Sequence, residues 1–353
     1  MNLKTLRGKV DGLDKKIISL LNARAGMAGV IAKTKIKEGK SIYSPERESE
    51  VLKRIVELNR GPLDSEALQS IYREIMSSSL SLGKPLVIAY LGPQASFSNL
   101  AALKRFGTQL EYVPCESITD VFLEVEKGNA DYGVVPIENS IEGAVTYTLD
   151  MFVDSDLKIC SQIILDIAHN LLANCAKDKI KRVYSNPNVL GQCRIWLQEN
   201  LPCAERIEVS STTRAAIIAA KEKNSACIAS LLAAKIYKLN VLARNIEDSP
   251  HNATRFMVIG RANVAATKHD RTSILFSIKD KVGALHDMLV PFKKYRINLT
   301  KIESRPSKKK AWDYYFYLDL EGHRDDPKVK KALAELEAKC KFMKILGSYP
   351  IGE

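Results

Sequence analysis

The sequence predicts a multidomain protein of α and α/β structure, with an all-helical N-terminal unit, a larger α/β unit and a small C-terminal α+β unit. Three observations lead to this prediction. The 353 residues are enough for two or three domains of roughly 100–200 residues each. Apolar residues keep a helical spacing up to about residue 85, and beyond it strand-like runs alternate with helical ones. From residue 271 onward, three alternating runs are interspersed with two helical patterns.

The first unit, residues 1–85, is predicted to be a set of three helices. Residues 5–36 form an amphipathic pattern, because apolar residues recur every three or four positions. A second helix is expected to begin at Ser44 and Pro45, which suit the N-cap and the first turn. A third is expected to follow Asp64 as its cap and to end before a Gly-Lys-Pro break.

The second unit, residues 86–262, is predicted to be an α/β domain. Short apolar runs with strand character recur between helical patterns: 86–90, 132–135, 158–164, 182–184, 226–229 and 256–259. Such alternation predicts a mostly parallel sheet covered by helices. Residues 261–270 lack periodicity and are predicted to be a linker.

The third unit, residues 271–353, is predicted to be a small sandwich. Residues 273–278, 300–304 and 314–320 have strand patterns, and helices are expected from Gly283 and over 327–340. The order β-α-β-β-α predicts a ferredoxin-like fold.

Charge, cysteines and hydropathy narrow the function classes. The net charge of +12 is split between the ends, with +6 over residues 1–85, −1 over 86–270 and +7 over 271–353. A nucleic-acid-binding protein more often concentrates such charge beside a recognition motif, and we find no such motif. No apolar run approaches a membrane span, and the first residues lack a signal-peptide pattern. Seven scattered cysteines without a CxxC pair favour no disulfide framework, no metal site and a cytoplasmic location.

Cations on the first predicted helix suggest a site for an anion. Arg24 and Lys35 are 11 residues apart, which places them on one helix face about 16 Å from each other. Arg7 lies 17 residues before Arg24, about 25 Å away along the axis, so one helix cannot bring both to one small ligand. Either these charges are a solvated face, or an antiparallel partner chain supplies its own Arg7.

The first unit resembles the all-helical chorismate mutase family across nearly all of residues 3–85. The resemblance is carried by LRGKVDGLDKKIISLLNARAGMAGVIAKTK, SPERESEVL and IYREIMSSSLSL. It implies that arginines hold the two carboxylates of chorismate, that a lysine donates to the breaking ether oxygen and that a glutamate binds the ring hydroxyl. The family's residues match Arg7, Arg24, Lys35, Arg47, Glu48 and Ser79. Gly83 stands where the family usually has Gln or Glu, so a reduced mutase rate is expected.

The second unit resembles prephenate dehydratases over residues 86–262. The resemblance is carried by LGPQASFSNLAA, ADYGVVPIENSIEGAVTYTLD, YSNPNVLGQCRIWL and NIEDSPHNATRFMVIG. It implies a two-lobed α/β fold of the periplasmic-binding-protein kind. It also implies loss of carbon dioxide and hydroxide from prephenate without a cofactor, with Thr254 as an oriented donor to the leaving hydroxyl.

Polar residues beside the predicted strand ends suggest a ligand cleft on their own, because ligands of open α/β sheets collect at the carboxyl ends of strands. Each alone also suits a turn or a cap. The residues expected to bind substrate are Asn139, Ser140, Ser185, Gln192, Ser211, Thr212 and Arg255. Glu138 is either a strand-end residue or, if burial raises its pKa, an acid. His169 is expected to be structural, because apolar neighbours surround it.

The third unit resembles the ACT amino-acid-binding domain that follows prephenate dehydratases. Two strings carry the resemblance, Gly283-Ala284-Leu285 and Glu303-Ser304-Arg305-Pro306. They imply an allosteric site for L-phenylalanine, formed where two copies meet, and hence a homodimer or homotetramer. A sandwich that only mediates dimerisation is the alternative.

The order of the three units resembles the bifunctional chorismate mutase/prephenate dehydratases of phenylalanine biosynthesis. The expected ligands are therefore chorismate, prephenate and L-phenylalanine, with no cofactor. Two alternatives stay open from the sequence: a dehydratase whose mutase domain is weak or vestigial, and a non-catalytic amino-acid sensor.

Overall fold

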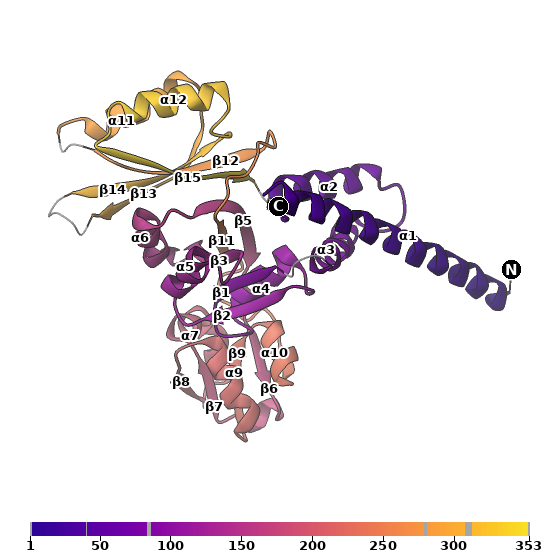
Figure 1. Cartoon of the computed structure of the whole chain (residues 1–353). Coiled ribbons are helices and arrows are strands. Elements are labelled where there is room, and N and C mark those ends of the chain that lie inside the picture. Colours follow the sequence, from indigo (N-terminus) through magenta and orange to yellow (C-terminus); the bar gives the residue numbers. More distant parts are fainter. Residues whose placement is uncertain (1, 40, 83–85, 279–280, 308–312, 352–353) are drawn as a thin grey trace.

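The computed structural model describes residues 2–39, 41–82, 86–278, 281–307 and 313–351. Figure 1 shows an N-terminal helical unit, an α/β body of two lobes and a C-terminal sheet with helices over one face. The predicted multidomain α and α/β fold is confirmed.

The N-terminal unit consists of α1 (Leu3–Lys37), α2 (Pro45–Leu58) and α3 (Ser65–Ser81), as predicted. Asn2 caps α1, and Asp64 caps α3 by accepting a hydrogen bond from the backbone of Ala67 at 2.7 Å. Ser44 is the N-cap of α2, but its hydroxyl donates to Glu46 rather than capping the helix.

The first half of α1 projects from the body (Figure 1). Its apolar side chains are exposed over several turns: Leu3, Leu6, Val10, Leu13, Ile17, Ile18 and Leu20. Exposed apolar faces of this kind are typical of protein–protein interaction surfaces.

The first lobe contains a mixed sheet with the strand order β2-β1-β3-β11-β5, and β4 pairs with β3. β1 is parallel to β2 and β3, whereas β11 is antiparallel to β3 and β5. The strands are β1 (Val87–Leu91), β2 (Glu111–Cys115), β3 (Tyr132–Asn139), β4 (Gly143–Ala144), β5 (Lys158–Asp166) and β11 (Ala253–Gly260). The helices are α4 (Phe97–Phe106), α5 (Ile118–Lys127) and α6 (Thr146–Asp154).

The second lobe contains the sheet β10-β6-β9-β7-β8. β7 is parallel to β8 and β9, and β6 is antiparallel to β9 and β10. The strands are β6 (Asn170–Ala173), β7 (Arg182–Ser185), β8 (Glu205–Glu208), β9 (Ser225–Ala229) and β10 (Asn240–Ala243). The helical segments are η1 (Lys177–Lys179), α7 (Pro187–Gln192), α8 (Arg194–Asn200), α9 (Thr212–Lys221) and α10 (Leu231–Tyr237).

The prediction of a mostly parallel sheet is therefore wrong, because both lobes have mixed sheets. The chain leaves the first lobe along β5 and returns along β11, so these two adjacent strands run in opposite directions. Strand patterns alone do not reveal strand direction.

The C-terminal unit is an antiparallel sheet in the order β13-β14-β12-β15, with two helices over one face (Figure 1). Its elements are β12 (Asp270–Ser277), α11 (Ala284–Lys294), β13 (Leu299–Pro306), β14 (Tyr314–Glu321), α12 (Pro327–Glu337) and β15 (Phe342–Pro350). β15 was not predicted and completes the β-α-β-β-α-β order. The predicted linker ends one residue earlier than expected, because Asp270 already belongs to β12.

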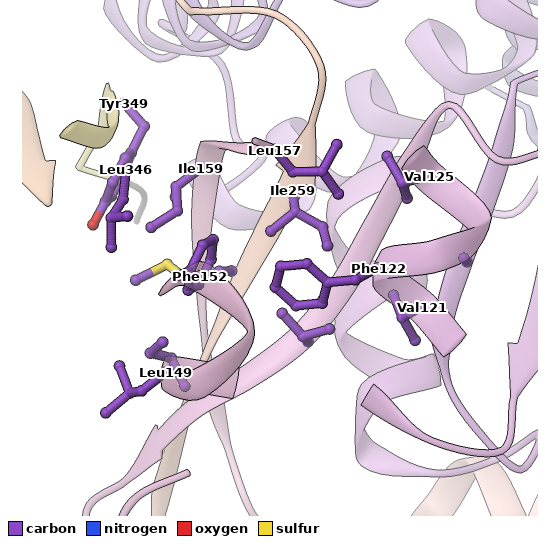
Figure 2. Packing of buried hydrophobic residues seen from close by; sticks show 14 of the residues in the cluster. Val121, Phe122, Val125, Leu149, Phe152, Leu157, Ile159, Ile259, Leu346 and Tyr349 are labelled. Atoms are coloured by element: carbon purple, nitrogen blue, oxygen red, sulfur yellow. The ribbon is translucent and has the colours of Figure 1, made fainter. Parts of the chain in front are cut away.

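The C-terminal sheet shares a hydrophobic core with the first lobe. Phe122 and Phe152 meet edge to face at 5.2 Å, and Leu346 and Tyr349 of β15 belong to the same cluster (Figure 2). A Cβ atom at Gly347 would lie 2.2 Å from the carbonyl oxygen of Ile159, so β15 lies directly on β5 only because residue 347 is glycine. In the described part of the chain, no helix combines the length and apolar character needed to cross a membrane.

Candidate active sites

A cavity of about 320 Å³ lies among α1, α2, α3 and the end of α4. Its walls hold five of the side chains that the sequence analysis grouped together: Arg24, Lys35, Arg47, Glu48 and Ser79. Arg73 and Arg105 also line it and were not predicted. The cavity thus carries several cations in a confined space, which favours an anionic ligand.

Hydrogen bonds orient two of these cations. The Arg24 guanidinium donates to the Ser79 hydroxyl at 3.1 Å, and that hydroxyl donates to the carbonyl of Ile75 at 2.7 Å. Lys35 donates to the carbonyl of Ile42 at 3.1 Å. Because Ser79 accepts a hydrogen bond from Arg24, any effect of Ser79 on a ligand would be exerted partly through that arginine.

Glu48 pairs with an arginine from outside the helical unit. Arg105 Nη2 lies 3.2 Å from Glu48 Oε2, and Arg105 Nε donates to the Tyr43 hydroxyl at 2.9 Å. Arg47, in contrast, forms an exposed ion pair with Glu50 at 2.9 Å. No helix-spacing argument could have found Arg105, because it lies on α4 and reaches the cavity only through tertiary folding.

The structure does not bring Arg7 into this cavity. Arg7 lies in the exposed, projecting half of α1, far along the helix from Arg24. Gly83, where the family pattern has Gln or Glu, falls outside the described residues.

A second polar cluster lies where the two lobes meet. Asn139 Nδ2 lies 2.8 Å from both Thr254 Oγ1 and Asn252 Oδ1. Asn252 Nδ2 in turn donates to Gln192 Oε1 at 3.0 Å. Strand β3 thus supplies Asn139, β11 supplies Thr254, and α7 of the second lobe supplies Gln192. The sequence analysis missed Asn252, although it stands only two residues before Thr254.

The cluster has a fixed set of donors and acceptors. Gln192 Nε2 donates to the Glu142 carboxylate at 3.0 Å, so its Oε1 faces His169 Nε2 at 2.9 Å and accepts that hydrogen bond. Burial lowers the pKa of His169, so the imidazole is neutral near pH 7. Asn139 Oδ1 accepts from the backbone of Ile141 and Glu142, so its amide nitrogen faces Thr254. With that donor on its oxygen, the Thr254 hydroxyl keeps its own proton available for a ligand.

The other predicted binding residues have local contacts. Ser140 exchanges hydrogen bonds with the carbonyl of His251 and the backbone N–H of Ala253. Ser185 is buried and donates to the carbonyl of Ile228, and Ser211 caps α9, where Thr212 is the first residue. Ser185, Ser211 and Thr212 lie in the second lobe, and their described contacts do not connect them to Thr254.

Family models match three successive segments of the chain: chorismate mutase type II over residues 6–84, prephenate dehydratase over 88–264 and the ACT domain over 272–338. The bifunctional chorismate mutase/prephenate dehydratase of Aquifex aeolicus is 52% identical over 353 residues, covering 99% of this chain and 98% of that protein. The chain belongs to the bifunctional chorismate mutase/prephenate dehydratase family. We call the three matched segments the mutase, dehydratase and ACT domains.

Further relatives agree. The bifunctional chorismate mutase/prephenate dehydratase of Stutzerimonas stutzeri is 46% identical over 355 residues, covering 99% of this chain and 97% of that protein. A prephenate dehydratase from Arthrobacter aurescens, solved in complex with L-Phe, superposes with a TM-score of 0.71 at 34% identity. The superposed region covers 75% of this chain and 90% of the Arthrobacter aurescens chain.

Arg255 does not join the Thr254 cluster. Neighbouring residues of a strand face opposite sides of the sheet, so Arg255 points away from the side that Thr254 faces. Its guanidinium donates to Glu138 at 2.9 Å, to Asp319 at 2.7 Å and to the Tyr349 hydroxyl at 2.9 Å. Our expectation that Arg255 binds substrate therefore conflicts with its position, because it links the dehydratase domain to the ACT domain.

Glu138 has the same orientation as Arg255. Burial alone would raise the pKa of the Glu138 carboxyl. Hydrogen bonds from Lys301 and Arg255 outweigh this effect and hold that pKa below its usual range. A carboxyl that stays ionised is no source of a proton near pH 7, so the acid role considered for Glu138 is not supported.

The two predicted ligand strings of the ACT domain lie at the same end of its sheet. Tyr315 of β14 pairs with both Ser277 at the end of β12 and Arg305 near the end of β13. Gly283-Ala284-Leu285 then begins α11, where Gly283 has φ +76°. Glu303-Ser304-Arg305-Pro306 ends β13, an edge strand. Arg305 also lies 3.5 Å from Asp150 of the dehydratase domain.

Proposed function

We propose that the chain converts chorismate to prephenate and then prephenate to phenylpyruvate, under feedback regulation by phenylalanine. Residues 1–85 would carry the mutase, 86–262 the dehydratase and 271–353 the regulatory domain. The observation that supports this best is the 52% identity to a bifunctional enzyme over the whole chain, together with the gathering of Arg24, Lys35 and Glu48 around one cavity.

The mutase step is a pericyclic rearrangement, in which no proton moves and no group leaves. The side chains then need only bind a compact conformer and stabilise the negative charge that develops on the ether oxygen. Arg24 and Arg47 bind the carboxylates, with Arg7 of a second chain completing the clamp. Lys35 donates to the ether oxygen, and Glu48 accepts from the ring hydroxyl.

The dehydratase step breaks two bonds of prephenate. The electrons of the bond to the departing carboxylate enter the ring, carbon dioxide leaves, and the ring hydroxyl departs and takes up a proton to become water. Thr254 donates a hydrogen bond to that departing oxygen, since Asn139 already occupies a lone pair of its own oxygen. Ser140, Ser185, Gln192, Ser211 and Thr212 would hold the remaining oxygens of the substrate once the lobes close around it.

Regulation is proposed through the ACT domain. Gly283, Ala284 and Leu285 at the start of α11 offer a backbone turn and a helix N-terminus to an amino-acid carboxylate. Glu303, Ser304, Arg305 and Pro306 would flank the ligand from β13. The solved prephenate dehydratase bound to L-Phe supports this choice of ligand. The exposed apolar face of α1 supports at least a homodimer.

Separate assays with each substrate test the proposal. We expect the purified chain to consume chorismate and, when given prephenate instead, to form phenylpyruvate. Phenylpyruvate from prephenate without chorismate consumption would indicate a vestigial mutase domain. Loss of both reactions in a folded protein would leave the amino-acid sensor as the better interpretation.

A further inference from the structure

One side chain of the dehydratase domain reaches into the mutase cavity. Arg105 stands near the end of α4, and it is one of the residues that line the cavity. Its ion pair with Glu48 is enclosed, since the Arg105 side chain is 13% exposed and the Glu48 side chain 10% exposed. Removing one partner of a buried ion pair costs more free energy than removing one partner of an exposed pair.

The pair leaves Glu48 able to accept a further hydrogen bond. Glu48 Oε2 lies within ion-pair distance of Arg105 without an aligned hydrogen bond, and the Tyr43 hydroxyl hydrogen-bonds to the Glu48 carboxyl. Tyr43 accepts from Arg105 Nε, which fixes the guanidinium in place. Burial raises the pKa of Tyr43 well above its usual value, so this phenol stays neutral. Arg105 therefore balances the negative charge of Glu48 without saturating its oxygens.

We propose that Arg105 is a positioning residue of the mutase site, an inference that rests on the proposed mutase function. Its guanidinium pairs with the Glu48 carboxylate and holds it oriented toward the place of the substrate's ring hydroxyl. The mutase site is then a composite of two domains, complete only when the dehydratase domain is docked against α2 and α3.

The variant Arg105→Gln tests this in the full chain. We expect kcat/KM of the mutase to fall about 10- to 100-fold, the range for losing a polar interaction with a charged group. The dehydratase rate with supplied prephenate should stay near wild type, because the side-chain partners of Arg105 are Glu48 and Tyr43 and not the Thr254 cluster. Lys104→Gln, a change of an exposed cation on the same helix, is the matched control and should alter neither rate.

A conservative replacement of Arg105 separates positioning from packing. Arg105, Tyr43, Arg24, Lys35, Arg47 and Arg73 are the charged or titratable groups that surround Glu48 in the cavity. Arg105→Gln takes away the cation in contact with Glu48, so the carboxylate loses the partner that orients it and the loss should fall on the mutase reaction alone. Arg105→Lys keeps the charge but loses the hydrogen bond to Tyr43, so we expect a smaller loss of mutase rate than in Arg105→Gln.

A double variant closes the argument. If Arg105 acts through Glu48, Arg105→Gln should cost little more once Glu48→Gln is present. Normal mutase kinetics in Arg105→Gln would overturn the proposal, as would fully additive losses in the double variant. Should that variant misfold, unchanged kinetics in Arg105→Lys would equally contradict it. A wild-type chain without mutase activity would instead refute the proposed function itself.

Discussion

Arg255 of the dehydratase domain donates to Asp319 of the ACT domain at 2.7 Å, and both side chains are 8% exposed. The same guanidinium contacts Glu138, and Lys301 of the ACT domain contacts that carboxylate too. Charged groups of two domains are thus joined in one buried network, directly behind the strand that carries Thr254.

Arg255→Gln should strongly destabilise the contact between these domains. The change leaves the carboxylate of Asp319 buried without its cation, and breaking a buried pair from one side costs about 3–5 kcal/mol. We expect the free energy of unfolding in urea to fall by about that amount. Lys294→Gln, which breaks an exposed pair with Glu335, is the control and should change little. Equal effects of the two substitutions would show that the buried network adds no stability.

His169→Gln should change how stability depends on pH. His169 is 1% exposed, and burial lowers its pKa, whereas a histidine in the unfolded chain titrates near about 6.5. Between these two pKa values the unfolded state binds a proton that the native state does not. The free energy of unfolding of the wild type should therefore fall as pH drops below about 6.5, by up to about 1.4 kcal/mol per pH unit.

The variant has no imidazole at position 169 to take up this proton on unfolding, so its urea midpoints at pH 7.5 and pH 5 should differ less than those of the wild type. Parallel pH dependence in the two proteins would contradict a buried, neutral His169.

Arg7 is predicted to complete the mutase site of a second chain, because it lies about 25 Å along α1 from Arg24. Arg7→Ala and Arg24→Ala chains should each lose mutase activity as homodimers. Mixed dimers should recover part of it, since one of their two sites keeps both arginines. Absence of recovery in verified heterodimers would count against shared sites.

Leu285→Asp should remove inhibition by phenylalanine without lowering the basal dehydratase rate. Leu285 lies in the first turn of α11 and is 40% exposed, so the aspartate is tolerated by the fold but places a charge where an apolar ligand would bind. A coupling free energy of about 1–3 kcal/mol corresponds to roughly 5- to 150-fold inhibition. Dehydratase rates against phenylalanine concentration measure it, and a variant as sensitive as the wild type would exclude this site.

Local signals in the sequence predicted much of the fold. Asp64 and Pro45 mark helix starts through bonds and backbone angles that depend on near neighbours, and the structure has those helices. Strand direction was not predictable, because β11 pairs with strands that lie about 90 and 120 residues earlier in the sequence. β15 was also missed, since apolar and polar residues alternate only weakly over residues 342–350. The segment also contains Gly347, which is required there because a side chain would collide with Ile159.

The candidate sites show the same division. Arg24, Lys35 and Ser79 could be grouped by helix spacing and family pattern, and they do line one cavity. Arg105 could not, because only tertiary folding brings it to the cavity, whereas Asn252 was missed although it stands two residues before Thr254. Strand alternation alone predicts that Arg255 faces the opposite side of the sheet from Thr254. We nevertheless assigned both residues to the substrate, because they are adjacent in the motif that resembles the family.

The most direct test of two activities at two separate sites is a time course of the Thr254→Val chain with chorismate. Valine keeps the shape of threonine and removes the hydroxyl that we propose donates to the leaving oxygen, a loss expected to slow dehydration by about 100-fold or more. The variant should consume chorismate at the wild-type rate, accumulate prephenate and form almost no phenylpyruvate, whereas the wild type carries the reaction through to phenylpyruvate. Phenylpyruvate at the wild-type rate from the variant, or chorismate left unconsumed by both proteins, would contradict it.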